Sequence, residues 1–329
     1  EALEPGRLEL SGIAVAGHDG PRIARAVAEF RISRLLSEGR IDRLDVSGAT
    51  MGLIVDAGGR LTISGVPHLA GGSGGGVLTA ADLPVDRIDL RDARIDLATP
   101  WIGAVIPLEG VLEVSGHDLR AQGTAWLETG IGRAALGFAA TIDPAGAVEL
   151  GIETRSATVD AGNLSATGVA GWLAARREAG GEISFAGEAA ASDMAVSSLV
   201  FTRPVVQFGG SEAAGWALVR AELAGAEIRL DATLEDGTVA FVGDAELTDL
   251  ARVAALVAPG FDFAGAATVE ATGSVPLDGF LSGWGGPLPG ASGDVAVRIR
   301  DGRIGPLNRV AGEIRAEFAA VGDRLKLRG

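Results

Sequence analysis

Residues 41–53 read IDRLDVSGATMGL, and residues 85–97 read VDRIDLRDARIDL. Aligned at an offset of 44 residues, both begin with the pattern apolar-Asp-Arg-apolar-Asp-apolar, and both end in Leu. Residues 7–15, RLELSGIAV, fit the same frame at an offset of 36 from the first copy. Residues 220–230, RAELAGAEIRL, fit it again, with Ala226, Ile228 and Leu230 matching Ala93, Ile95 and Leu97, and Leu199–Phe208 is a looser copy. A repeat with apolar and polar residues in alternation indicates a series of β-strands.

Each copy shifts its alternation by one residue near the middle. Leu90 and Ile95 are five residues apart, and this separation places them on opposite faces of a regular strand. A β-bulge at Arg91-Asp92, and at Ser47-Gly48 and Ser11-Gly12 in the other copies, returns such residues to one face and bends the strand. Without a bulge, each copy is two short strands joined by a kink.

The rest of the chain is also dominated by alternation with a period of two, and helical patterns are few. Thr248 is placed to cap a short helix over Asp249–Ala258. Trp172–Ala179 could form two helical turns, whereas Ile23–Ser37 is better read as a strand through Ile32 followed by a half-turn before Gly39. The fold class predicted is all-β with one or two short helices.

Turns are marked by dipeptides of the kind that reverses strands. Asp19-Gly20, Asp236-Gly237 and Asp301-Gly302 separate alternating segments. The stretch Gly71–Gly76 is the most Gly-rich part of the chain, and we expect a division near it: residues 1–70 as an N-terminal β-unit, and residues 71–329 as its continuation with the short helix near 249–258.

Composition excludes several classes of protein. The 329 residues include 50 Gly and no Cys, and 28 basic against 43 acidic residues give a net charge of −15. The acidic surplus argues against nucleic acid as a partner, and 47% hydrophobic residues argue against disorder. No apolar run reaches the length of a membrane span. We expect the chain to be a segment of a longer protein whose membrane anchor lies outside it.

Residues capable of catalysis or metal binding form no convincing constellation. Gly71–Gly75 spells a nucleophile elbow but lacks the strand–turn–helix context, and is read as a linker. His18, His68 and His117 have no metal-ligand spacing and fit exposed turns. The carboxylates of Asp42/Asp45 and Asp86/Asp89 alternate with arginines, and this favours ion pairs on a solvated face over a metal site. We therefore expect no enzyme, no cofactor and no metal.

Three segments carry a resemblance to a known group. Glu38–Ala49 with the Gly59–Ile63 strand resembles the opening β-unit of AsmA-like bacterial proteins. Leu83–Leu97 followed by Ile106–Gly110 is similar to the YdbH-like branch, which also carries a dicarboxylate-transport label. The Asp249–Ala258 helix followed by Phe261–Gly265 is similar to the middle region of that branch.

The resemblance implies an elongated, twisted β-groove, built from repeats as an antiparallel sheet, that acts as a bridge in the periplasm of a Gram-negative cell. Such proteins are anchored in the inner membrane and carry phospholipids between the inner and outer membranes, in contact with envelope proteins. The expected partners are thus phospholipid acyl chains and envelope proteins that bind outside this segment. The residues expected to line the groove are Leu44, Val46, Met51, Leu53, Ile88, Leu90, Ile95, Leu97, Leu223, Ile228 and Leu230.

Other readings of the same pattern stay open. From periodicity alone, the apolar stripe could equally form the core of a β-sandwich. The alternative function is a structural or adhesive secreted β-solenoid or β-sandwich domain without lipid transport. A carbohydrate-active β-sandwich is poorly supported, because aromatic residues are 5% of the chain and Tyr is absent. A dicarboxylate transporter is disfavoured by the lack of a membrane span.

Overall fold

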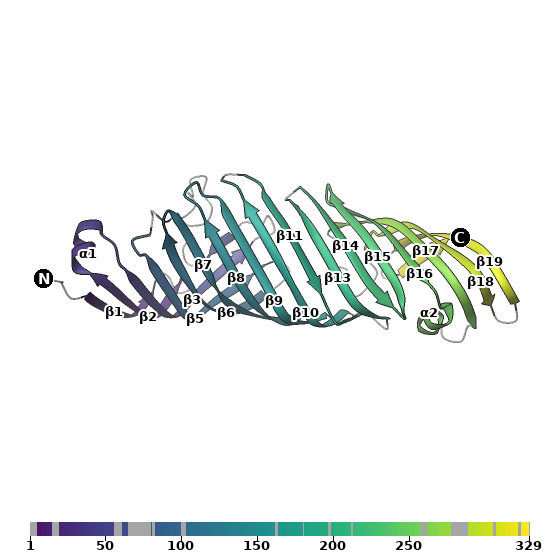
Figure 1. Cartoon of the computed structure of the whole chain (residues 1–329), viewed down its shortest axis with the longest axis horizontal. Helices are drawn as coiled ribbons and strands as arrows, with labels where there is room; N and C mark the ends of the chain where they lie inside the picture. The colour runs from purple at the N-terminus through teal and green to yellow at the C-terminus, as the bar shows by residue number, and fades with distance from the viewer. Residues whose placement is uncertain are drawn as a thin grey trace. The chain divides into compact units, whose positions relative to one another are not determined.

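The computed structural model confirms an all-β chain (Figure 1). It describes residues 5–14, 20–55, 61–64, 80, 83–99, 103–161, 164–179, 181–196, 199–211, 213–257, 262–277, 289–304, 307–321 and 324–328. Contacts divide the chain into two units: unit 1 is Glu1–Thr154 with Ala174–Ile183, and unit 2 is Arg155–Leu173 with Ser184–Gly329. The Gly-rich stretch Gly71–Gly76 lies outside the described residues; the strands that begin at Arg43 and Arg87, before and after it, pair with each other within unit 1.

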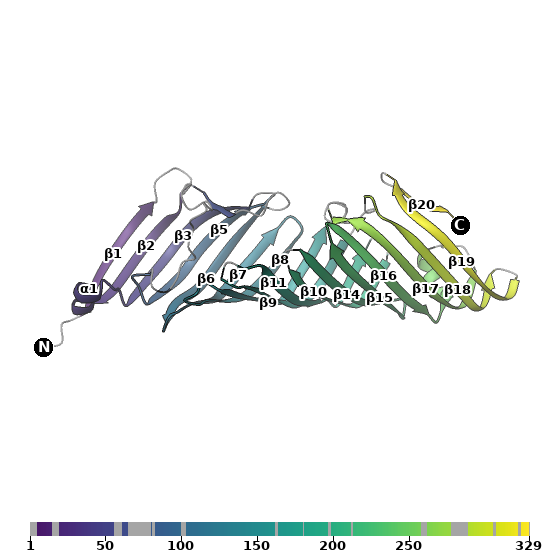
Figure 2. The ribbon, with the colours of Figure 1, turned by 90° about the horizontal axis from the view of Figure 1, so that it is seen from above.

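Unit 1 is a sheet of long strands that lie side by side (Figure 2). They are β1 (Pro5–Ala14), β2 (Arg22–Arg31), β3 (Arg43–Val55), β4 (Leu61–Ile63), β5 (Arg87–Ala98), β6 (Gly103–Ser115), β7 (Asp118–Thr129) and β8 (Gly132–Ile142). The spatial order is β1-β2-β3-β5-β6-β7-β8, antiparallel except for the parallel pair β3–β5. The short β4 pairs with the last residues of β3, beyond the end of β2.

Unit 2 continues the same construction. Its strands are β11 (Ile183–Ala190), β12 (Asp193–Val196), β13 (Leu199–Ser211), β14 (Ala214–Leu223), β15 (Ala226–Glu235), β16 (Thr238–Leu247), β17 (Phe263–Pro276), β18 (Ser292–Ile304), β19 (Leu307–Val321) and β20 (Arg324–Arg328). From β13 to β20 each strand pairs antiparallel with the next, and β11 and β12 pair with successive parts of β13. β9 (Val148–Ala161), β10 (Leu164–Arg177) and β11 have residues in both units.

The two offsets of the sequence repeat correspond to strand pairings in the sheet of unit 1. In the parallel pair β3–β5, Leu44 is opposite Ile88 and Leu53 is opposite Leu97, which is the offset of 44. Leu8 of β1 and Leu44 of β3 both face Ala28 of β2, which gives the offset of 36. Repeated copies therefore lie in register, and each apolar position extends into a row across several strands.

The bulge predicted at Arg91-Asp92 is confirmed. Asp92 has a φ of 50°, and the pairing of β5 with β6 shifts between Leu90 and Ala93. Gly12 and Gly48 occupy the corresponding places with φ of 66° and 62°, although the registers of β1 and β3 with β2 are the same before and after them. The left-handed conformation at these positions explains the Gly residues, because a Cβ is disfavoured there.

The copy at 220–230 is a hairpin and not one bent strand. The chain reverses at Ala224-Gly225, whose φ values of 54° and 85° match a type I′ turn between β14 and β15. The looser copy fits better: Arg203 of β13 has a φ of 51°, and the register with β14 shifts between Thr202 and Val205.

Of the three Asp-Gly turns, Asp236-Gly237 is confirmed as the hairpin between β15 and β16, with φ of 48° and 71°. Asp301-Gly302 is wrong as a turn between strands, because it lies inside β18 as an irregularity where the register with β19 shifts after Ile299. An Asp with left-handed backbone conformation can thus form either a turn or a bulge, depending on which partner strand is available. Asp19 lies outside the described residues.

The helices are short and their ends differ slightly from expectation. α2 (Leu250–Val257) is capped by Asp249 and not Thr248, since the Ala251 N–H donates to the Asp249 carboxylate at 3.1 Å. After β2, α1 (Ile32–Glu38) forms a full short helix in place of a half-turn and ends at Gly39, whose φ is 67°.

Trp172–Ala179 is not helical, which corrects the predicted pair of turns. Its residues through Arg177 belong to β10, where half-buried Leu173 and Ala175 alternate with exposed neighbours. The Ala- and Leu-rich composition favours a helix locally, but pairing in the sheet overrides that preference.

Candidate functional site

One face of unit 2 is apolar in every row from β14 to β19. Along β15, half-buried Ile228, Leu230 and Leu234 alternate with exposed charged residues. The paired registers place the following residues on this face: Gly215, Ala217, Val219, Ala221, Leu223, Ala226, Ile228, Leu230, Ala232, Leu234, Val239, Phe241, Gly243, Ala245, Leu247, Ala267, Val269, Ala271, Gly273, Val275, Gly293, Val295, Val297, Ile299, Gly312, Ile314, Ala316 and Phe318. We call this set the unit 2 face.

Unit 1 has a corresponding apolar face. Its rows follow from the same registers and from the bulge in β5, which returns Ile95 to the side of Leu90. The set, called the unit 1 face, consists of Leu8, Leu10, Ile13, Ile23, Ala26, Ala28, Phe30, Leu44, Val46, Ala49, Met51, Leu53, Ile88, Leu90, Ala93, Ile95, Leu97, Ala104, Ile106, Leu108, Gly110, Leu112, Val114, Leu119, Ala121, Gly123, Ala125, Leu127, Ala134, Leu136, Phe138, Ala140 and Ile142.

Within each unit, no second sheet of described residues covers the apolar face. A sandwich core would bury most inward side chains. Here Leu8, Leu10 and Ile314 are 50%, 49% and 60% exposed, and Val275 is the one large side chain among those described that is less than 2% exposed. Most other face residues are half-buried by their strand neighbours alone. The sandwich-core interpretation therefore does not fit either unit by itself.

Helix α2 covers one end of the unit 2 face. Leu250 and Val253 of this helix pack on a small buried cluster of Ala226, Leu247 and Ala267. This is where the unit 2 face becomes a true core, and the rest of the face lies beyond the helix.

The structure places all eleven residues of the predicted lining on these faces. Leu44, Val46, Met51, Leu53, Ile88, Leu90, Ile95 and Leu97 belong to the unit 1 face, and Leu223, Ile228 and Leu230 to the unit 2 face. Val46 and Leu223 are only 5% and 7% exposed and offer little surface. The rows on β6 to β8 and β16 to β19 were missed, because these strands alternate without copying the repeat; their period of two was the available signal.

On both faces, phenylalanine rings lie over glycines of neighbouring strands. The tip of the Phe138 ring is 3.3 and 2.8 Å from the places that a Cβ of Gly110 and Gly123 would take. Phe318 lies over Gly293 in the same way, at 2.8 Å. Because each ring fills the space that a neighbour's side chain would need, the faces gain aromatic surface and keep low relief.

The opposite surface of unit 1 carries ion pairs within and between strands: Asp89 pairs across strands as expected, whereas Asp45 pairs with Arg43 of its own strand at 2.9 Å. Arg43 Nε is 2.7 Å from Asp89 Oδ2, and Arg87 Nη2 is 2.8 Å from Asp89 Oδ1. Arg87 also pairs with Glu113 of β6. Hydrogen bonds from Arg87, aided by the charge of Arg43, hold the pKa of Asp89 below its usual range. Each repeat thus supplies an Arg that bonds across strands, Arg43 to Asp89 and Arg87 to Glu113.

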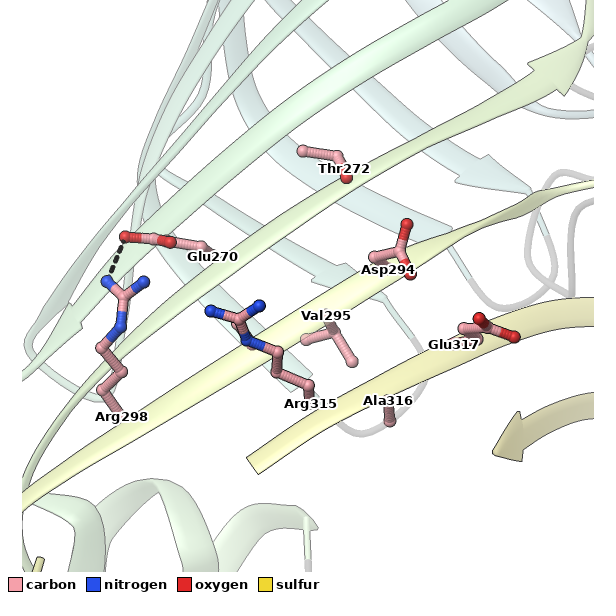
Figure 3. Close-up of a pocket in the computed structure, with 9 residues that line it drawn as sticks. Glu270, Thr272, Asp294, Val295, Arg298, Arg315, Ala316 and Glu317 are labelled. Carbon is pink, nitrogen blue, oxygen red and sulfur yellow. Dashed lines mark hydrogen bonds and ion pairs between the residues drawn. The ribbon is translucent and has the colours of Figure 1, made fainter. Parts of the chain in front are cut away.

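The polar side of β17 to β19 has an open depression of about 630 Å³ (Figure 3). Both of its arginines are paired: Arg298 from β18 points toward Glu270 of β17, with 2.8 Å between Nη1 and Oε1, and Arg315 from β19 bonds to Glu313 at 2.7 Å. It lies on the surface opposite to the unit 2 face and contains no nucleophile positioned by a base.

The remaining candidates form no catalytic or metal site in the described part of the chain. His117 is exposed in the turn between β6 and β7, as predicted. His18, His68 and Gly71–Gly75 lie outside the described residues. Among those that are described, no three His, Cys, Asp or Glu side chains are grouped to hold a metal ion, and no helix is long and apolar enough to cross a membrane.

Fold and faces together define a class: all-β units, each with one polar surface and one apolar surface that no second sheet of its own described residues covers. Comparison of the chain with protein-family models, with curated proteins and with solved structures gave no match.

Proposed function

We propose that this chain binds phospholipid acyl chains on the unit 1 and unit 2 faces, as a segment of a periplasmic bridge that is anchored to the inner membrane and carries phospholipids between the inner and outer membranes. The observation that carries the proposal is the continuous apolar character of each face across its paired strands, without a second layer. A sheet with one apolar surface needs a covering partner. Acyl chains supply that cover with no requirement for specific polar contacts.

The expected affinity for an acyl chain is low enough for the bound lipid to move along the face. Burial contributes about 0.8 kcal/mol per methylene group. An acyl chain of about sixteen carbons that rests on an open face loses roughly half of its contact with water, so the gain is about 6 kcal/mol. This corresponds to a dissociation constant of tens of micromolar. The low relief produced by the Phe rings over Gly residues avoids pockets that would hold a chain in one place.

The transport role and the location rest on two supports. One is the pair of faces, and the other is the resemblance of Glu38–Ala49 and Leu83–Leu97 to AsmA-like proteins of the YdbH-like branch. In this proposal no residue reacts covalently, and the charged surface stays in water while the apolar faces hold the chains.

The alternative is a structural or adhesive domain in which a protein surface covers the apolar faces. It shares the need for cover but differs in the occupant. A covering protein would have to match a nearly flat surface with side chains of its own, whereas lipid adapts its shape to the face.

The test is purification of this segment from cells without detergent, followed by native mass spectrometry and lipid extraction. The proposal expects bound phospholipid that exchanges with added vesicles of phosphatidylethanolamine and phosphatidylglycerol. Loss of bound lipid in Leu90→Glu, with retention in Glu109→Gln on the opposite surface, would support the face as the site. A folded, lipid-free chain that does not take up lipid from these vesicles would reject the proposal in favour of the structural role.

A further inference from the structure

A charged cavity of about 580 Å³ lies where the apolar rows of β3 and β5 begin. Asp42 and Asp86 come two residues before Leu44 and Ile88, in phase with the apolar positions of their strands. Val114, near the end of β6 on the unit 1 face, is part of the cavity wall. The cavity therefore adjoins the apolar face and is separate from the Arg87–Asp89 pairs on the polar surface.

Helix α1 supplies the cationic side of this cavity. It follows β2 and lies at the end of that strand (Figure 1). Arg34 of α1 donates from Nε to Glu38 at 2.9 Å and from Nη1 to Asp42 at 2.8 Å, and it also pairs with Asp86. Arg40, just after the helix, donates from Nε to Asp86 Oδ1 at 3.0 Å.

The arginines of this cavity have more hydrogen-bond donors than the neighbouring carboxylates accept. Both oxygens of Asp86 are engaged, Oδ1 by Arg40 and Oδ2 by Arg34. Within the described residues, Nη2 of Arg34 and Nη1 of Arg40 have no acceptor, and each carries two N–H donors. The exposed His117 ring lies on the same cavity. The free N–H donors of this site can therefore bind a further hydrogen-bond acceptor, and they bind an anion most strongly.

We propose that this cavity binds the phosphate group of a lipid whose acyl chain lies on the unit 1 face. The inference rests on the proposed function and specifies the ligand: a phosphate ester with an attached apolar chain. Among the described residues, each of the two guanidinium groups has one free terminal nitrogen that can donate to a phosphate oxygen, and hydrogen bonds between such oppositely charged groups are among the strong ones. Nearby carboxylates balance the arginines, which keeps the site from holding the anion permanently.

The experiment compares two soluble probes that share one chain. Lauroyl lysophosphatidylglycerol carries a phosphate, and monolauroylglycerol does not; calorimetric titration of each measures binding to the whole chain. The wild type is expected to bind the phosphate-bearing probe about tenfold more tightly, the contribution typical of a hydrogen bond to a charged group. Arg40→Gln removes that preference, and Arg94→Gln, an exposed arginine of β5 paired with Asp96, keeps it.

Arg40→Gln leaves Asp86 paired with Arg34, so we expect the variant to keep its fold, and thermal unfolding checks this expectation. If Arg40→Gln does not fold, His117→Ala is used as the second variant. Equal binding of both probes by wild type and Arg40→Gln would overturn the phosphate site but leave the proposed function standing. Binding of neither probe would reject the proposed function itself. Inorganic phosphate binding as tightly as the lysolipid would show a site for free phosphate and overturn the lipid assignment.

Discussion

Replacing Leu230 with Glu places a charge in the middle of the unit 2 face. Leu230 lies between Val219 of β14 and Gly243 of β16, with its Cδ1 3.1 Å from the place of a Gly243 Cβ. One position covers about 5 Å of the face, the spacing between strands. That length corresponds to about four methylene groups, and with half of their contact with water removed on the face, the lost contact is worth about 1.6 kcal/mol, or roughly fifteenfold in affinity.

The assay measures the equilibrium affinity of the purified chain for a fluorescent fatty acid, and circular dichroism verifies that each variant is folded. Leu230 is half-buried and faces no second layer, so Leu230→Glu is expected to cost only about 1 kcal/mol in stability. Thr233→Glu is the matched control, because it adds the same charge to the same strand on the opposite, exposed side. Unchanged binding in a well-folded Leu230→Glu protein would refute the acyl-chain face.

Three other predictions concern stability. Hydrogen bonds from Arg31, and next from Arg34, hold the pKa of Asp42 below its usual range. The resulting stabilisation is present above the unfolded pKa of about 4 and is lost as the pH falls toward the folded pKa. The melting temperature of Asp42→Asn, measured from pH 3 to 7, should therefore fall less steeply with acid than that of the wild type. Asp92→Val should lower the free energy of unfolding by about 1–2 kcal/mol in urea titration, because a β-branched residue disfavours φ of 50°, while Asp92→Gly should not destabilise. Val253→Asp should lower the melting temperature by several degrees, because it puts a charge against the Ala267 cluster; an unchanged melting curve would show that α2 does not hold this end of the face.

Much of unit 1 could be predicted because its strands repeat a pattern in register. The offset of 44 appears directly as the parallel pairing of Leu44 with Ile88, and the odd spacing of Leu90 and Ile95 correctly required a bulge. Parallel rather than antiparallel pairing of β3 and β5 had no local signal, since side-chain alternation is the same in both.

Other features depend on contacts that no local pattern contains. Ala224-Gly225 makes a hairpin where a similar segment at Arg91-Asp92 makes a bulge, because the outcome depends on which strand pairs next. The cavity beside α1 joins Arg34 to Asp86 across 52 positions of sequence, and the repeat showed the Asp but not its partner. The faces were expected only in part, because β16 to β19 alternate without sequence copies.

The open faces also affect how the protein behaves in solution. Two copies without lipid would hide apolar surface by associating face to face, which is the usual fate of a large exposed apolar patch. The net charge of −15 opposes this approach through repulsion. At physiological ionic strength that repulsion is screened within about 8 Å, so salt should promote self-association of the lipid-free chain, and lipid should reverse it.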